Sequence, residues 1–182
     1  MIKKENLVWI DLEMTGLIPE SDTILEIATI ITDGGLNILE EGPALVIHQS
    51  DSVLDRMGQW VKDAHGKSGL TQAVRESNIS LEQAERETLA FIKKYCPPKK
   101  GVLCGNSVWQ DRNFLVRHMP QVADYLHYRL VDVTSVKELL YRWYPGSPHL
   151  SFLKKDSHRA LPDIFESIEE LRHYRKYFFI SA

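Results

Sequence analysis

The chain has 182 residues, of which 43% are hydrophobic, and a formal net charge of −3 at pH 7. No run approaches the roughly 18 apolar residues of a membrane span, and Met1-Ile2-Lys3-Lys4-Glu5 lacks the apolar segment of a secretory signal. A chain of this length and hydrophobic content fits one domain over residues 1–182. Cys96 and Cys104 form no CxxC pair and suggest no disulfide framework, so we expect a cytoplasmic location. The overall acidity disfavours a protein that coats long nucleic acid.

The first predicted strand carries two acids. Residues 7–10 and Leu12 are apolar and predict a short buried strand, in which Asp11 and Glu13 are embedded. Side chains two apart on a strand point to the same face, so these carboxylates project together. Their repulsion beside a core favours a divalent cation bound by oxygen ligands. The alternative is a strand that ends at Ile10, with both acids solvated in a loop.

The next segments predict a loop, a strand, a turn and a returning strand, at residues 15–22, 24–32, 33–35 and 38–48. The returning strand is interrupted at Gly42-Pro43. These three strands therefore predict an antiparallel meander. Residues 51–76 are polar and punctuated by glycines, which predicts short helices and loops.

Strands alternate with helices in the second half. Ser80 and Gln83 fit a capping box that starts a helix running to about Tyr95. Two further strands are predicted at 101–106 and 129–133, and helices at 110–118, from Pro120, at 134–144 and in a last segment ending near Tyr177. This order predicts an α/β fold with a mixed five-stranded sheet, an antiparallel meander followed by parallel strands, flanked by helices.

Two later segments add acids and a histidine. Asp111 lies just past a predicted strand and near a helix start, where the helix dipole alone also favours an acid. Pro162 is tolerated only in the first turn of a helix, so Asp163 lies in the opening turns and His158 at the lip or on the loop. This arrangement suits a rigid ligand beside a mobile acid/base group, although an isolated histidine is also an ordinary surface residue.

The two halves differ in charge. Residues 1–91 carry 7 Lys and Arg against 16 Asp and Glu, whereas residues 92–182 carry 15 against 9. An acidic half and a basic half suit a site that combines metal ions with a phosphate, and ordinary surface variation is the alternative.

Together these residues resemble the motifs of the DEDDh exonucleases and, among them, of the oligoribonuclease family. The likeness rests on five segments that cover nearly the whole chain: Trp9-Ile10-Asp11-Leu12-Glu13-Met14-Thr15-Gly16-Leu17; Gly105-Asn106-Ser107 with Gln110-Asp111-Arg112; His127-Tyr128-Arg129 with Asp132-Val133; Lys137-Glu138-Leu139; and His158-Arg159-Ala160-Leu161. The resemblance implies a ribonuclease H-like fold, a homodimer, and 3′-to-5′ hydrolysis of very short single-stranded RNA, dinucleotides especially, to mononucleotides.

The resemblance also implies catalytic roles. Two divalent ions, Mg²⁺ or Mn²⁺, would be held by four carboxylates, those of Asp11, Glu13, Asp111 and Asp163. His158 would deprotonate the attacking water, and Tyr128 would reach the site across the dimer.

Substrate contacts follow from the same resemblance. The bases would be gripped by Leu17, Trp60 and His65. A cap over the 5′ phosphate would be built from Ser107, Arg129, Thr134 and Ser135, the last three from the partner subunit. Without the resemblance, Trp60 fits a core position and Thr134 fits a helix cap.

Two features depart from the family pattern: Pro162 stands where an acidic residue is usual, and Val108-Trp109 is bulkier than expected. A proofreading-type DNA 3′ exonuclease would share the acids, but His127-Tyr128-Arg129 and the short chain argue against it. A catalytically silent RNA-binding module is the alternative from another class, and the intact acids and His158 argue against it.

Overall fold

The computed structural model describes residues 5–153 and 158–179, so residues 1–4 of the N-terminal stretch and Ser157 lie outside the described residues. The strands are β1 (Leu7–Met14), β2 (Ile24–Thr32), β3 (Ile38–Val46), β4 (Val102–Gly105) and β5 (Leu130–Asp132). The helices are α1 (Asp51–Leu54), α2 (Gln59–Lys67), α3 (Leu70–Glu76), α4 (Leu81–Lys93), α5 (Trp109–His118), α6 (Pro120–Tyr125), α7 (Val133–Trp143) and α8 (Ala160–Phe178). Within the described ranges, no helix is long and apolar enough to cross a membrane.

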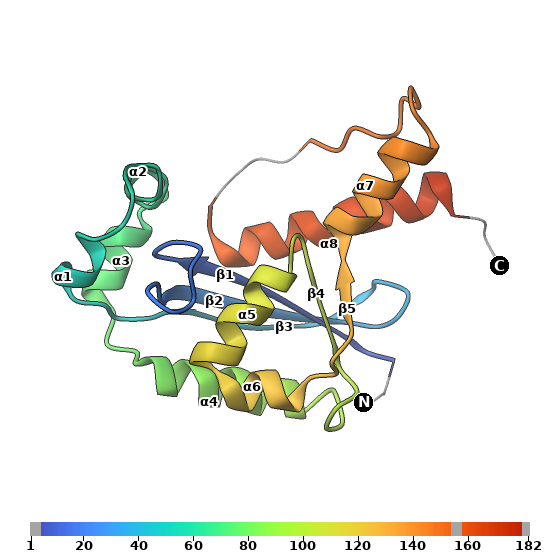
Figure 1. Ribbon diagram of the computed structural model, residues 1–182. Helices are drawn as coiled ribbons and strands as arrows, with labels where there is room; N and C mark the ends of the chain where they lie inside the picture. Colours follow the sequence, from blue (N-terminus) through green and yellow to red (C-terminus); the bar gives the residue numbers. More distant parts are fainter. Residues whose placement is uncertain (1–4, 154–157, 180–182) are drawn as a thin grey trace.

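The strands form one mixed sheet of order β3-β2-β1-β4-β5, with β1 at its centre (Figure 1). The pairs β1–β2 and β2–β3 are antiparallel, whereas β1–β4 and β4–β5 are parallel. The predicted meander followed by parallel strands is therefore confirmed. Because β1 continues to Met14, Asp11 and Glu13 lie within a strand and not in a solvated loop.

Successive side chains of β1 point alternately into two hydrophobic clusters, one on each face of the sheet. Val8, Ile10 and Leu12 pack in the cluster that includes α4, α5 and α6, whereas Trp9 packs in the cluster that includes α7 and α8. Figure 1 shows these two groups of helices on opposite faces of the sheet. Since Asp11 and Glu13 share the face of Trp9, they point toward α8.

A third, smaller cluster of buried residues holds α1 and α3 against β2. It contains Leu25 of β2, Leu54 of α1, and Leu70 and Val74 of α3. This packing fixes the short helices predicted over residues 51–76, and α2 lies between α1 and α3 in the chain.

The predicted interruption of the third strand is a bulge. Pairing steps from Ala28–Ala44 to Ile30–Glu41, so Gly42 and Pro43 together face one residue of β2. A bulge tolerates proline because its missing N–H breaks no ladder bond. A Cβ on Gly42 would lie 2.4 Å from the Phe91 ring, so glycine lets α4 approach the edge strand closely.

Two helix starts agree with the capping signals. Ser80 Oγ accepts a 3.2 Å hydrogen bond from Gln83 N, whereas the Gln83 side chain donates to Glu87, so only the serine half of the predicted capping box forms. Pro162 is the third residue of α8, as its missing N–H predicted.

Candidate active site

Three carboxylates meet where the end of β1 faces the start of α8. One oxygen each of Asp11, Glu13 and Asp163 lie within 4.8 Å of one another, and all three residues are partly exposed. Strand parity aims the first two at α8, and the first helical turn carries the third. The structure thus brings together three of the four acids singled out in the sequence.

Asp111 lies beside this group and not within it. It occupies the first turn of α5, is buried, and accepts a 3.0 Å hydrogen bond from Leu12 N. The β1–β4 pairing ends at Trp9 and Cys104, which leaves the next part of β1 open to α5. Burial raises the pKa of Asp111 to about 7, because it removes the water that would solvate the charge.

The electrostatics of the cluster favour a cation. Burial, followed by the charges of Asp163, Glu26 and Asp111, raises the pKa of Glu13 to about 8, and Arg159 opposes the shift. Carboxylates this close resist ionising together unless positive charge lies between them. Hard oxygen ligands are those that Mg²⁺ and Mn²⁺ prefer, so the donor set fits a divalent cation.

This cluster predicts how stability depends on pH without metal. The pKa of Glu13 rises from 4.5 to about 8 on folding, so folded Glu13 binds its proton more tightly than the unfolded chain does. This tighter proton binding stabilises the folded state, and the stabilisation is fully present below pH 4.5 and is lost as the pH rises through about 8. The melting temperature in EDTA should therefore fall between pH 5 and pH 8, and Mg²⁺ should raise it most at pH 8.

Thermal unfolding of the wild type and of Glu13→Gln, which cannot ionise, measures this effect. The variant should lose less stability over the same interval. A wild type and variant with parallel pH dependence in EDTA would contradict the repulsive cluster.

His158 precedes the start of α8 and contacts α2. Its φ of 49° lies in the left-handed region, which a residue with a Cβ adopts only under local constraint. Its ring meets that of Trp60 edge to face, with centroids 5.8 Å apart and an interplanar angle of 86°. Trp60 is 71% exposed, so it is no core residue.

His65 ties α2 to the end of β1. Its Nε2 lies 3.0 Å from Met14 O, which in the tautomer that donates there leaves Nδ1 without a proton. Nδ1 is 3.8 Å from Glu13 Oε2 and has no hydrogen-bond partner among the described residues. Burial lowers the pKa of His65, which favours the neutral ring.

Leu17 projects from a tightly held turn beside β1. Asp22 accepts hydrogen bonds from Thr15 Oγ1 at 3.1 Å and Ile18 N at 2.9 Å, and Gln110 donates to Leu17 O at 2.6 Å. A Cβ on Gly16 would collide with the Asp22 carboxylate, so a side chain there would displace Asp22 from these hydrogen bonds. The apolar side chain of Leu17 is left 72% exposed.

Three predicted cap residues lie at the carboxyl ends of β4 and β5. The N–H of Ser107, a residue with φ of 49°, donates to Asp132 Oδ1 at 3.0 Å and to Thr134 Oγ1 at 2.9 Å. Asp132, and not Thr134, caps α7 by accepting from Thr134 N at 2.9 Å. Ser135 follows in the same turn and is exposed. Ser107 and Thr134 are thus direct neighbours within one chain.

Tyr128 and Arg129 lie away from the acids of their own chain. They precede β5, and Arg129 Nε donates to Tyr128 Oη at 3.1 Å. Leu130 pairs with Leu103, which pairs with Val8, so Arg129 lies level with the beginning of β1 and two strands away. The four residues from there to Asp11 span roughly 13 Å at the usual strand rise.

Glu26 and Arg159 lie beside the acids, although no sequence motif assigns either residue a role. Glu26 lies opposite Glu13 in the β1–β2 ladder, and its carboxylate accepts hydrogen bonds from Arg159. All nine residues of β2 are buried. A charge in the middle of such a strand needs a partner, and this signal is visible in the sequence.

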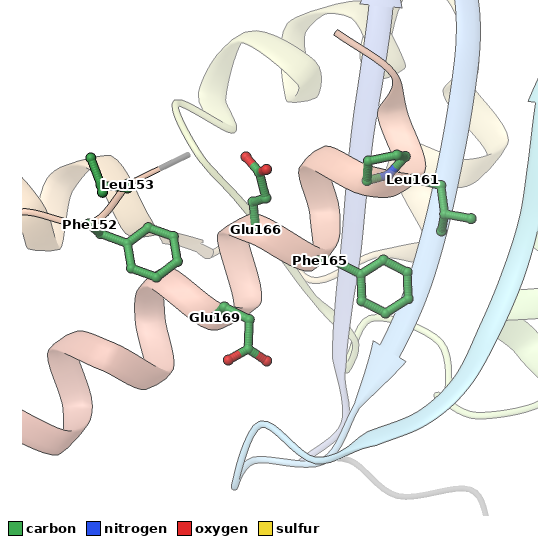
Figure 2. Close-up of a pocket in the computed structure, with 7 residues that line it drawn as sticks. Phe152, Leu153, Leu161, Phe165, Glu166 and Glu169 are labelled. Carbon is green, nitrogen blue, oxygen red and sulfur yellow. The ribbon is translucent and has the colours of Figure 1, made fainter. Parts of the chain in front are cut away.

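A hollow of about 470 Å³ lies along α8, apart from the acid cluster. Figure 2 shows Phe152 and Leu153 beside the helix, from which Glu166 and Glu169 project. Its other lining residues are Leu161, Pro162 and Phe165. The lining is mostly apolar and includes none of the predicted site residues, so the chemistry belongs to the acid cluster.

Comparisons with known proteins show the family of the chain. A family model described as Exonuclease, of the RNase T type, matches residues 8–171. The oligoribonuclease of Pseudomonas syringae pv. tomato is 56% identical to this chain over 178 residues, which are 98% of each chain. That of Pseudoalteromonas atlantica is 54% identical over 178 residues, again 98% of each.

Solved structures share the fold. The zinc-bound complex of E. coli exonuclease I with single-stranded DNA matches 97% of this chain with a TM-score of 0.75 and 16% identity. Exonuclease I from Methylocaldum szegediense matches 95% with a TM-score of 0.72 and 18% identity. This chain spans 41% of either protein, and at such identity the likeness shows the fold alone.

Proposed function

Because the chain belongs to the oligoribonuclease family of exonucleases, we propose that it degrades short RNA from the 3′ end with metal ions held by Asp11, Glu13, Asp111 and Asp163. The enzyme is a 3′-to-5′ exoribonuclease that hydrolyses short oligonucleotides to mononucleotides. The observation that carries the proposal is the approach of three carboxylates from β1 and α8 to within 4.8 Å. Hydrolysis of a short 5′-labelled RNA, arrested by EDTA, tests it.

The residues divide the chemistry between them. Asp11, Glu13 and Asp163 would hold divalent ions, Mg²⁺ or Mn²⁺, at the junction of β1 and α8, and Asp111 is fixed beside them through Leu12 N. Two such ions would supply Lewis acidity for the hydrolysis of the phosphodiester. His158 takes the proton of the attacking water at a ring nitrogen, since it stands at the start of the helix that carries Asp163.

Apolar and aromatic groups beside the acids receive the bases. Leu17 and Trp60, which both follow β1 in the chain, expose 72% and 71% of their surface. Stacking of a base on an aromatic ring is worth roughly 1–3 kcal/mol and tolerates any sequence. The Trp60 ring also contacts the His158 ring, so a nucleobase stacked on Trp60 would lie beside the proposed general base.

The 5′ side of the substrate is closed by a second subunit in this proposal. Arg129 and Tyr128 are exposed and lie level with the opposite end of β1 from their own acids, which supports a role in a neighbouring site. Arg129 contributes a charge-assisted hydrogen bond to the 5′ phosphate. For this cap we likewise propose Ser107 of the subunit that holds the acids, with Thr134 and Ser135 of the second subunit. We also propose a homodimer, one domain over residues 1–182 and a cytoplasmic location.

Mixing two inactive variants tests the shared site. Asp11→Asn lacks a metal ligand and Arg129→Ala lacks the cap, so a mixed dimer contains one site with both intact. Subunit exchange between equal amounts should restore about a quarter of wild-type turnover on a dinucleotide, because roughly half of the dimers are mixed and one site works in each. Activity that stays at the level of the separate variants after exchange would place the cap in the same subunit or remove it.

A DNA exonuclease shares the fold, but similarity to exonuclease I at 16% to 18% identity does not extend to its substrate. A DNA dinucleotide assayed beside its RNA counterpart separates the two activities. A silent RNA-binding protein would have no turnover for EDTA to stop.

A further inference from the structure

The start of α8 is fastened to β2 by one carboxylate. Glu26 Oε1 accepts a hydrogen bond from Arg159 Nη2 at 2.7 Å, and Oε2 accepts from Arg159 Nε at 3.0 Å. Glu26 Oε2 also accepts from Ala160 N at 3.1 Å. The Glu26 side chain is 3% exposed and that of Arg159 36%, so the pair is held mostly away from water.

Glu26 acts as the cap that α8 otherwise lacks. Arg159 is the N-cap residue by position, but its side chain makes no capping hydrogen bond. The first N–H groups of a helix need acceptors, and the carboxylate from β2 satisfies that of Ala160. Because the planar guanidinium of Arg159 donates to both carboxylate oxygens, this bidentate ion pair also fixes the orientation of Arg159 relative to Glu26.

The Glu26–Arg159 ion pair lies between His158, which precedes α8, and Asp163 in the first turn of α8. Arg159 directly follows His158, whose φ is 49°, and Asp163 N donates to Arg159 O at 3.1 Å in the first helical turn. On the sheet side, Glu26 pairs with Glu13 in the β1–β2 ladder. One ion pair therefore connects the strand that faces Glu13 to the turn that carries His158 and Asp163.

We propose that Glu26 and Arg159 are positioning residues that set His158 and Asp163 against Asp11 and Glu13, without touching substrate. This role rests on the proposed function of the site. Groups that orient metal ligands typically change metal affinity or activity by roughly 10- to 100-fold when they are lost. A pair that only stabilised the fold would change the melting temperature and leave kcat per folded molecule unchanged.

The test compares Glu26→Gln, Arg159→Gln and the double variant. Each single variant should lower kcat on a 5′-phosphorylated RNA dinucleotide by roughly 10- to 100-fold, with KM changed by less than about threefold. Arg159→Gln leaves the buried Glu26 charge unpaired, and Glu26→Gln leaves the half-buried Arg159 without its ion-pair partner, so each should melt earlier than the wild type, Arg159→Gln most. The double variant regains melting temperature because no charge is left unpaired, but its kcat stays within about threefold of the single variants.

Arg172→Gln is the matched control. Arg172 also lies on α8 and donates to Leu36 O between β2 and β3, but far along the helix from Asp163. It should lower the melting temperature and keep kcat and KM. Recovery of kcat together with stability in the double variant, or an equal loss of kcat in Arg172→Gln, would overturn the positioning role.

A second measurement keeps this test separate from the proposed activity. Calorimetric titration with Mn²⁺ should show that Glu26→Gln binds the ion roughly tenfold more weakly than the wild type. Equal Mn²⁺ affinity in both proteins would overturn the positioning role. A wild type that binds Mn²⁺ but leaves RNA intact would overturn the proposed function, while the comparison of affinities still decides the role of the pair.

Discussion

Asp11→Asn and Asp163→Asn should each reduce hydrolysis of a short RNA to less than about a tenth of the wild-type rate. Either change removes one carboxylate charge from a group whose oxygens lie within 4.8 Å, with almost no change in volume. Loss of a ligand from a two-metal site costs several kcal/mol, and each 1.36 kcal/mol is about tenfold in rate. The fold survives because removal of a charge relieves repulsion in the cluster.

Single-turnover rates and circular dichroism of the purified variants measure both expectations. Asp51→Asn is the control, because Asp51 is exposed on α1 and pairs with Arg75 away from the acids. It should keep the wild-type rate. An Asp163→Asn enzyme that retained more than about a tenth of the rate would show that this carboxylate is no metal ligand.

His158→Ala lowers kcat by roughly 100- to 10,000-fold if the ring is the general base. A base must be unprotonated to accept a proton, so the pH profile of the wild type should have an acidic limb on which activity declines. The variant should lose this limb of the profile together with its rate.

The control is His149→Ala, because His149 is exposed and its ring stacks on that of Tyr177, with the ring centroids 3.9 Å apart. Its pH profile should match that of the wild type. If His158→Ala kept both the rate and the acidic limb, another group would be the base, and the contact between His158 and Trp60 would have another purpose.

Local patterns in the sequence predicted most of the fold. The apolar runs predicted all five strands, and the alternation along β1 placed Asp11 and Glu13 on one face. Pro162 predicted the start of α8 because its restriction acts within a single helical turn. These features depend on neighbours in the chain, which the sequence displays directly.

The contacts that complete the site depend on distant residues and could not be read in this way. Glu26 and Arg159 are 133 positions apart, and no local pattern states that they meet. Asp111 reaches Leu12 N only because β4 ends early. The sequence at Gly42-Pro43 predicted only an interruption of the strand. Whether the strand breaks or forms a bulge there depends on its pairing with β2, which the local sequence does not show.

Turnover on a ladder of single-stranded RNAs, from two nucleotides upward and at several salt concentrations, tests the assignment of short RNA as substrate most directly. A net charge of −3 gives no long basic track for additional phosphates. We expect dinucleotides to be cleaved faster than RNAs of about ten nucleotides, with the shallow salt dependence of roughly one or two phosphate contacts. Equal rates along the ladder together with a steep salt dependence would contradict this, because they would mean that the enzyme tracks along polymer.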